Sequence, residues 1–272
     1  MSGTPQTTDV AISDADLLEQ TANAVREAGS VLRERFGEIV RYQTREELVQ
    51  ALDANDDVSL AILRPTLTRL RPEAGWVEDE LAGGELPAGE WWVVDPAEGN
   101  VNHLRTIPDW AVTATLVREN KPVLTAVHVP LTGETYTALA GGGAYLDGRP
   151  LRVSQLTDLG LSIVATSQAR PDEDETVMRR VGSSITAMLL GALSIRTSVP
   201  ATLHLANVAA GRLEGFWQFS GGRADMFPGS LLVTEAGGQI SDVDGNPWTT
   251  RSESFLATAP GIHAEAVATL SL

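Results

Sequence analysis

The stretch WWVVDPAEGNVNH, residues 91–103, places two carboxylates and a glycine directly after a strongly apolar run. The apolar residues 91–94 predict a strand, so Asp95 falls at its carboxyl end, where functional groups of α/β proteins commonly project. Gly99 allows a positive φ or a close approach of the backbone to a ligand. Asn100 is a suitable start for a helical turn, whose exposed N–H groups would form an anion site.

The two carboxylates of this stretch suggest a metal site. Asp95 and Glu98 stand three residues apart on a tight turn, from which both can reach one hard cation. A strand that ends in Asp-Pro is also common in proteins without a metal, so a simple capped turn is the alternative interpretation. The wider sequence has to decide between the two.

Two further acidic segments fit the metal interpretation. In WVEDELAGG, residues 76–84, acids occupy all of positions 78–80, and a bound cation would relieve their mutual repulsion. In ADMFPGSLLVTEAGG, residues 224–238, Asp225 precedes an apolar segment that predicts a helix ending at the double glycine. Each segment also has a plainer interpretation: a solvated acidic loop for the first, and for Asp225 a helix cap worth about 1 kcal/mol.

Composition and charge restrict the class of protein. The chain has 272 residues, of which 43% are hydrophobic and 21% charged, and this predicts one large globular domain or two compact lobes. A formal net charge of −16 argues against nucleic acid as a partner, because phosphate contacts need clustered Lys and Arg. A small phosphorylated substrate stays compatible with this charge, provided that a cation lies between protein and phosphate.

The sequence carries no sign of export or of a membrane segment. We expect no signal peptide, because the first residues have no basic region followed by an apolar one, and no membrane span, because there is no long apolar run. The absence of cysteine excludes disulfides, thiolate zinc sites and cysteine nucleophiles. We therefore expect a cytoplasmic protein.

The spacing of apolar residues predicts helices that alternate with strands. The expected helices cover residues 13–38, 57–70, 172–188, 201–211 and 225–236. The expected strands cover residues 75–77, 91–95, 111–118, 122–129, 162–166, 194–198 and 215–219, with a hairpin at 135–146. This alternation predicts an α/β (α+β) layered protein with sheets covered by helices. We expect an N-terminal α+β lobe over residues 1–150, which carries the metal motifs, and a C-terminal α/β lobe over residues 151–272.

The three acidic elements, in this order and spacing, resemble the inositol monophosphatase family of magnesium-dependent, lithium-sensitive phosphatases. That family carries a Glu-Glu pair, then W-x-x-D-P-x-D-G-T-x-N-F, then W-D-x-A-A-G followed by a helix ending E-A-G-G. Here the second motif reads WVVDPAEGNVNH and the third ADMFPGSLLVTEAGG, and residues 207–219, NVAAGRLEGFWQF, are similar to the family's stretch before its last aspartate. The similarity extends from about Leu17 to about Ala259 and implies an alternating α/β/α/β/α sandwich and a homodimer.

The resemblance also implies a role for each matched residue. Asp95 would bridge metal ions, the carbonyl of Ala97 would be a further ligand, and Glu98 stands where the family has its second aspartate. Asp79 aligns with the family's metal-binding glutamate, and Asp225 would complete the site from the other lobe. The implied reaction is the hydrolysis of a phosphate monoester by a metal-activated water.

Several matched positions depart from the family pattern. Asn100 replaces the threonine whose hydroxyl helps to orient the attacking water, and Glu98 is one methylene longer than aspartate. In REELVQALDAND, residues 45–56, Glu47 stands for the first aspartate of the family's D-L-V-T-x-x-D, Gln50 stands for its threonine and Asp53 matches its last aspartate.

The expected substrate side differs as well. By the resemblance, the backbone N–H groups of Gly99 and Asn100 would hold the phosphate. His204 stands where the family often has an aspartate that binds a sugar hydroxyl, and Gln218 stands where inositol phosphatases often have a glutamate. His204 has an alternative interpretation as an ordinary packed histidine on an alanine-rich helix. Inositol phosphate is therefore not assumed as the substrate.

These observations leave three functions open. The first is a phosphatase that uses Mg²⁺ or Mn²⁺ on a small phosphorylated metabolite, such as a sugar, polyol or nucleotide phosphate, with Asp95, Glu98, Asn100 and Glu47 as catalytic residues. The second is a non-catalytic protein that binds a ligand or partner, suggested by the altered residues of the motifs. The third is a related biosynthetic enzyme that uses the same cleft for another reaction.

Overall fold

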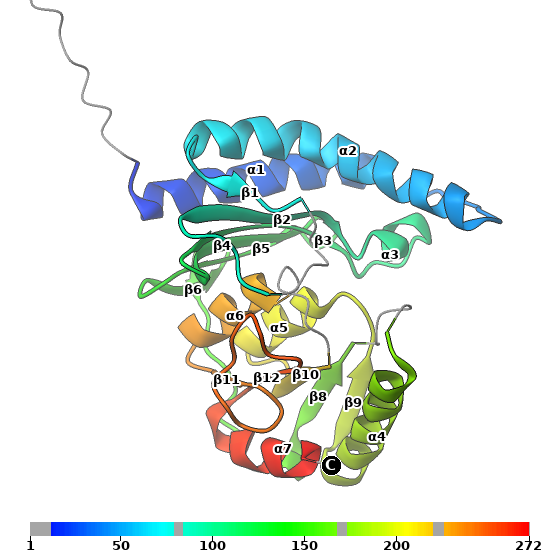
Figure 1. Cartoon of the computed structure of the whole chain (residues 1–272), viewed down its shortest axis with the longest axis vertical. Coiled ribbons are helices and arrows are strands. Elements are labelled where there is room, and N and C mark those ends of the chain that lie inside the picture. Colours follow the sequence, from blue (N-terminus) through cyan, green and yellow to red (C-terminus); the bar gives the residue numbers. More distant parts are fainter. Residues whose placement is uncertain (1–11, 79–83, 168–172, 220–225, 272) are drawn as a thin grey trace, which may run out of the picture.

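The elements of the chain stack in five alternating layers (Figure 1). The structure, a computed structural model, describes residues 12–78, 84–167, 173–219 and 226–271. From one end to the other, the layers are a helix pair, a seven-stranded sheet, a second helix pair, a five-stranded sheet and a third helix pair (Figure 1). The expected α/β/α/β/α sandwich is confirmed.

The first two layers come from residues 14–150. The helices are α1 (Asp14–Arg35) and α2 (Arg45–Leu70), and a short helix, α3 (Asn100–Leu104), follows the second strand. The strands are β1 (Gly75–Trp76), β2 (Glu90–Glu98), β3 (Ala111–Arg118), β4 (Lys121–Val129), β5 (Glu134–Leu139), β6 (Gly143–Leu146) and β7 (Arg149–Pro150). They lie in chain order and pair antiparallel, except that β1 and β2 run parallel.

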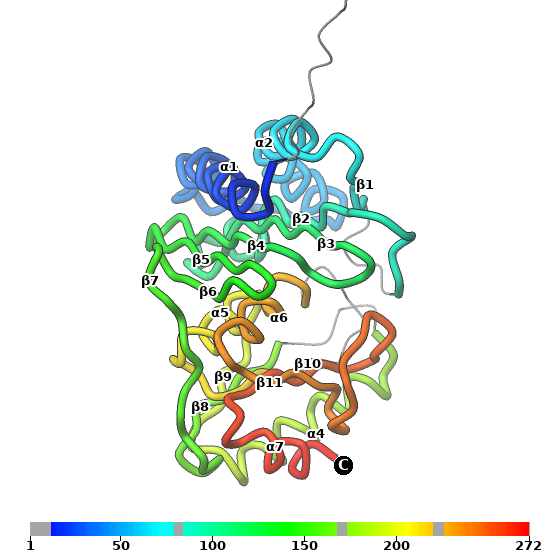
Figure 2. The backbone as a smooth tube through the Cα atoms, turned by 90° about the vertical axis from the view of Figure 1, so that its left-hand side faces the viewer, coloured from blue at the N-terminus to red at the C-terminus, as the bar shows by residue number. Residues whose placement is uncertain are grey.

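The other three layers follow β7, from which the chain runs along one side of the molecule to the second sheet (Figure 2). The helices are α4 (Glu175–Gly191), α5 (Ala201–Ala209), α6 (Met226–Glu235) and α7 (His263–Leu270), with single 3₁₀ turns η1 (Leu159–Leu161) and η2 (Pro260–Ile262). The strands are β8 (Ile163–Thr166), β9 (Ser194–Thr197), β10 (Gly215–Gln218), β11 (Gln239–Ser241) and β12 (Phe255–Thr258), in the order β11-β12-β10-β8-β9. A division into lobes at residue 150 stays a proposal.

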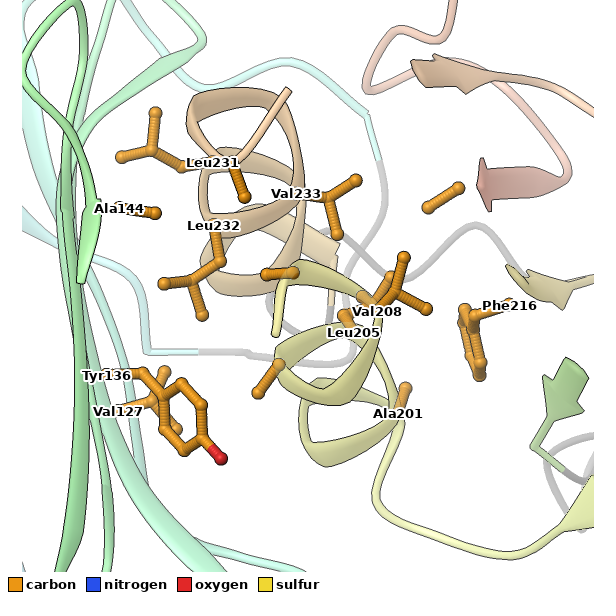
Figure 3. Packing of buried hydrophobic residues seen from close by; sticks show 14 of the residues in the cluster. Val127, Tyr136, Ala144, Ala201, Leu205, Val208, Phe216, Leu231, Leu232 and Val233 are labelled. Atoms are coloured by element: carbon orange, nitrogen blue, oxygen red, sulfur yellow. The ribbon is translucent and has the colours of Figure 1, made fainter. Parts of the chain in front are cut away.

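Helices α5 and α6 form the central layer and are apolar on more than one side. Figure 3 shows Val127 and Tyr136 of the seven-stranded sheet facing these helices on one side, and Phe216 of the five-stranded sheet on the other. Leu205 of α5 and Leu232 of α6 lie between them and are fully buried. A helix that is covered on several sides carries few charges, which explains the alanine-rich and leucine-rich sequences of both helices.

The start of each N-terminal helix is set by a side-chain cap. Ser13 accepts a hydrogen bond from the Asp16 N–H at 3.1 Å. The second helix was expected from residue 57, but α2 begins at Arg45, with Thr44 as its cap. Its first twelve residues are largely polar and mostly exposed, so they lack the apolar stripe from which a helix is predicted.

Among the helices of the described ranges, none combines the length and the apolar character that crossing a membrane requires.

Candidate active site

Asp95 and Glu98 emerge from the same face of β2 because the strand carries a bulge. Asp95 lies opposite Thr113 of β3 and Glu98 lies opposite Ala111, so β2 has one extra residue between these two pairs. Side chains three positions apart would point to opposite faces of a regular strand, and the extra residue brings them to one face. Ala111 packs with residues of α5 and α6, which identifies this face as the one toward the central layer. The strand expected over residues 91–95 thus continues to residue 98.

Asp95 closes the bulge through its own side chain. Its Oδ1 accepts a hydrogen bond from the Ala97 N–H at 3.0 Å, and the Asp95 N–H donates to Thr113 Oγ1 at 3.4 Å. Ala97 is buried in the apolar cluster that includes α1 and α2. The turn therefore fixes the direction of the Asp95 carboxylate before any ligand binds.

Glu98 connects the turn to the central helix layer. The residue is only 3% exposed, and its Oε2 accepts a hydrogen bond from Thr202 Oγ1 at 3.2 Å. Thr202 lies in the first turn of α5 and is itself fully buried. Sequence reasoning did not find Thr202, because one threonine in an apolar helix carries no signal of its own.

Gly99 has the positive φ that its place in the sequence allowed. Its φ is +81°, and it is the N-cap residue of α3. A Cβ at this position would lie 2.8 Å from the Asp109 carbonyl oxygen and 3.1 Å from Pro200 Cδ. Both the backbone conformation and the close packing therefore require glycine. The helical turn expected from Asn100 is also present.

The side chain of Asn100 is held by α2 on both of its ends. Its Nδ2 donates to Asp56 Oδ1 at 2.8 Å and to the Leu52 carbonyl oxygen at 3.0 Å. Its Oδ1 accepts from Asn55 Nδ2 at 2.8 Å. The amide thus has one orientation, and it binds a carboxylate rather than an open position.

Asp56 is an acid that sequence reasoning missed. Its pKa is raised to about 7, first by burial and then by the negative charge of Asp53, while the hydrogen bond from Asn100 opposes both effects. The motif comparison chose Asp53, but Asp56 is the residue that contacts Asn100. Because this segment is helical, Asp53 and Asp56, three positions apart, lie next to each other on the helix surface. Both acids are therefore candidates for the site.

His103 continues this polar network into the protein. Its Nε2 donates to the Leu32 carbonyl oxygen at 2.9 Å, so Nδ1 accepts the hydrogen bond from Asn55 Nδ2 at 3.0 Å. Burial lowers the pKa of His103, which keeps the ring in the neutral form that this pattern needs. The ring packs edge-on against Phe36 and Trp110.

Glu47, which the motif comparison placed among the catalytic residues, lies at the exposed start of α2. Its N–H donates to Thr44 Oγ1 at 3.2 Å, and its Oε2 accepts from the Gln43 N–H at 2.8 Å. This reciprocal arrangement satisfies N–H groups that a helix start leaves without a helical partner. The contacts of Glu47 are therefore those of a helix cap, and they do not connect it to Asp95.

The two residues expected on the substrate side are both buried. His204 Nε2 donates to the Ser198 carbonyl oxygen at 3.0 Å, and its ring stacks on Phe216 at a centroid distance of 5.7 Å. His204 also lines a cavity of about 320 Å³, together with residues such as Arg196. Gln218 accepts a hydrogen bond from the Ser167 hydroxyl. A substrate-binding role for either residue stays a prediction.

Comparison with known proteins agrees with the motifs and the fold. Residues 14–271 match the model of the inositol monophosphatase family. The chain belongs to this family. An inositol-1-monophosphatase of Rhizobium meliloti (strain 1021) is 34% identical over 238 residues, which are 84% of this chain and 86% of the relative. The family consists of metal-dependent phosphoric monoester hydrolases, so the expectation of an enzyme of this class is confirmed.

Two further similar proteins have names that do not mention inositol monophosphatase. A protein named Nus factor SuhB, from Pseudomonas aeruginosa, is 32% identical over 238 residues, which are 85% of this chain and 86% of the relative. The solved structure of the extragenic suppressor protein suhB from Bartonella henselae has 27% identity and a TM-score of 0.80, and the match covers 94% of this chain and 100% of that one. The family therefore includes proteins that are named for other roles.

The donor atoms near the turn suit the kind of metal that the family uses. The carboxylates of Asp95 and Glu98 and the carbonyl of Ala97 offer only oxygen, which is the ligand type of magnesium. The other two predicted ligands, Asp79 and Asp225, lie outside the described residues. Within the described ranges, no group of three or more His, Asp or Glu side chains is placed to hold a metal ion. The residues present thus fit a magnesium site in chemical type, and Asp79 and Asp225 remain predicted ligands.

Proposed function

We propose that this chain is a magnesium-dependent phosphatase that hydrolyses a small phosphate monoester, such as a sugar, polyol or nucleotide phosphate. The observation that carries the proposal is the bulge in β2, which brings Asp95 and Glu98 to one face directly before the glycine turn of α3. Metal-dependent hydrolysis of phosphate monoesters is the chemistry of the family. We expect that Mn²⁺ can take the place of Mg²⁺ in the assay. The specific substrate is left open, because His204 and Gln218 differ from the residues that the inositol phosphatases use.

The residues of the turn have two proposed roles, metal binding and phosphate binding. Asp95, Glu98 and the Ala97 carbonyl would hold magnesium, with Asp79 and Asp225 as the further proposed ligands. When bound, magnesium would stabilise the charge of the phosphoryl group and acidify a water molecule. The backbone N–H groups of Gly99 and Asn100, at the start of α3, would bind the phosphate oxygens.

Asn100 would position Asp56, and Asp56 would accept the proton of the attacking water. Asn100 cannot relay a proton as a threonine hydroxyl can, but it holds Asp56 at 2.8 Å. A carboxyl group with a pKa of about 7 is well matched to accept a proton near neutral pH. We therefore propose Asp56 as the general base, whereas Glu47, expected among the catalytic residues, has the contacts of a helix cap.

We also propose an oligomeric state and a location in the cell. We expect a homodimer because the resemblance implies one, and a cytoplasmic location because the chain has no cysteine. Size-exclusion chromatography with light scattering tests the first, and fractionation of the source cells tests the second.

A phosphatase panel with and without Mg²⁺ tests the proposed activity. We expect phosphate release from at least one sugar, polyol or nucleotide monoester, its loss on chelation with EDTA, and its loss in Asp95→Asn. Asp244→Asn, at an exposed acid between β11 and β12, is the matched control and should retain full activity. Magnesium alone should also raise the melting temperature of the wild-type protein, since a ligand of the native state stabilises it.

A ligand-binding protein without catalysis is the second candidate. The hydrogen bonds that commit the Asn100 amide to α2, and the relative named Nus factor SuhB, favour it. A negative result on the whole panel, together with no heat and no thermal shift on adding Mg²⁺, would support this candidate and contradict the phosphatase.

A further inference from the structure

The Glu98 carboxylate and the Thr202 hydroxyl meet where the seven-stranded sheet touches the first turn of α5. Both residues are almost completely buried, so little water competes for their hydrogen bond of 3.2 Å. Hydrogen bonds to an ionised group are about twice as strong as neutral ones, and a buried carboxylate needs donors. The Thr202 hydroxyl is therefore a buried donor that favours one orientation of the Glu98 side chain.

The surroundings hold the two partners in a fixed relation. On the sheet side, Gly99 packs so closely on Pro200 that a Cβ would lie 3.1 Å from its Cδ. The buried Asn102 of α3 donates through Nδ2 to the Val199 carbonyl oxygen at 2.9 Å. The residues that lead into α5 are thus attached at two points to the residues that follow Glu98, and Thr202 has little freedom to follow a moving carboxylate.

Glu98 has a particular need for such a partner. It stands where the family motif has an aspartate, and its side chain has one more rotatable bond. A longer side chain populates more rotamers, and holding it in one of them costs conformational entropy. A donor at a fixed place offsets that cost.

We propose that Thr202 is a positioning residue, which holds the Glu98 carboxylate in the orientation that the magnesium site needs. The inference rests on the proposed function, in which Glu98 is a metal ligand. Thr202 does not contact metal or substrate in this role and acts only through Glu98. Partners of metal ligands typically contribute about 10–100-fold to metal affinity, and we expect an effect at the lower end for a single neutral donor.

Magnesium binding by three single variants tests this role. Mg²⁺ alone is titrated by calorimetry and by thermal shift into wild type, Thr202→Val, which keeps the shape without the donor, and Thr202→Ser, which keeps the donor. We expect Thr202→Val to weaken Mg²⁺ binding about tenfold and Thr202→Ser to stay close to wild type. Thr202→Ala replaces the valine variant if the latter does not fold in EDTA.

A double variant separates positioning from packing. In a Glu98→Ala background, Thr202→Val should cause no further loss of Mg²⁺ affinity, because its action passes through the missing carboxylate. Unchanged binding by Thr202→Val, or an equal loss in both backgrounds, would overturn the inference and leave the proposed function intact. No magnesium response in the wild type would instead overturn the proposed function, and the inference with it.

Discussion

At the scale of single residues, the least expected feature is a carboxyl group with a raised pKa next to an amide. Asp56 lies within hydrogen-bond distance of Asn100, at 2.8 Å, and burial is the main reason that its pKa rises to about 7. In the unfolded chain the pKa of this carboxyl group has its usual value of 3.8. Between pH 3.8 and about pH 7, the native protein therefore holds a proton on Asp56 that the unfolded chain has lost. The stability of the fold should therefore fall as the pH rises through this window.

Replacing Asp56 by Asn should remove that loss. In EDTA, we expect the unfolding free energy of Asp56→Asn to match wild type at pH 4 and to exceed it by on the order of 2 kcal/mol at pH 8, with solvent screening taken into account. Urea denaturation at a series of pH values measures the difference. Asp57→Asn, at the exposed neighbour, should show no such trend, and a difference between Asp56→Asn and wild type that stays constant from pH 4 to pH 8 would contradict the shift.

The same variant should impair catalysis. If Asp56 accepts the proton of the attacking water, Asp56→Asn lowers kcat by on the order of 10²–10⁴ and leaves KM nearly unchanged. Steady-state kinetics with the substrate found in the panel provide the test, and the more stable but inactive protein is the signature to look for. Retained kcat would assign Asp56 to structure alone.

The residues of the site were predictable to different degrees. Asp95, Glu98 and Gly99 could be predicted because they follow an apolar strand in one short stretch of sequence. Asp56 and Thr202 could not, because each becomes relevant only through a contact with another segment: Asp56 through the position of α2 beside α3, and Thr202 through the approach of α5 to β2.

At the scale of elements, the turn between β2 and α3 packs against the residues that lead into α5. Gly99 and Gly133 both have a positive φ, +81° and +77°, but of the two only Gly99 has neighbouring atoms within 4 Å of the place that a Cβ would occupy. Gly133→Ala should therefore cost about 1–2 kcal/mol, the general cost of a left-handed alanine. Gly99→Ala should cost clearly more, because the added Cβ meets the Asp109 carbonyl oxygen. The urea concentrations at the midpoint of unfolding measure the difference between the two variants. Equal midpoints would contradict the packing argument.

The start of α2 offers a test of what Glu47 does. As a helix cap, Glu47 needs only an acceptor, so Glu47→Gln should keep both stability and activity. Glu47→Ala should lower the unfolding free energy by about 0.5–1 kcal/mol and leave kcat near the wild-type value. A large loss of kcat in Glu47→Gln, with unchanged stability, would restore Glu47 as a catalytic acid or base.

Element boundaries were predictable where an apolar pattern exists. The expected strand at residues 111–118 matches β3, whereas the first half of α2 was missed since its residues are largely polar. The signal that was present is Thr44 followed three residues later by Glu47, which is a helix-start pattern. β11 and β12 were also missed, because they are short and lie beyond the last clear apolar segment.

At the scale of the whole molecule, the four histidines all change the stability of the fold in the same direction when acid is added. All four have a lowered pKa because they are buried: His103, His128, His204 and His263. A group with a depressed basic pKa stabilises the fold above its unfolded value of about 6.5, and that stability is lost as the pH falls below it. Asp56 acts in the opposite direction over the same range, but it is a single group.

The protein should therefore lose stability between pH 6.5 and pH 5, before most carboxylates are protonated. Melting temperatures measured at constant ionic strength should fall over this interval, with the unfolded chain taking up more protons than the native one. His263→Phe, remote from the turn, should reduce the slope. A melting temperature that rises or stays level from pH 6.5 to pH 5 would show that other groups outweigh the histidines.

The single extra residue of the β2 bulge makes the length of this segment matter as well as its composition. Deleting one residue between Asp95 and Glu98 would restore a regular strand in which the two acids, then two positions apart, still share one face, but it would remove the bulge in which the Ala97 N–H donates to Asp95 Oδ1. The Asp95 carboxylate would then lose the donor that fixes its direction before a ligand binds. The number of residues between the two acids is therefore a requirement on this segment beside the identity of the acids themselves.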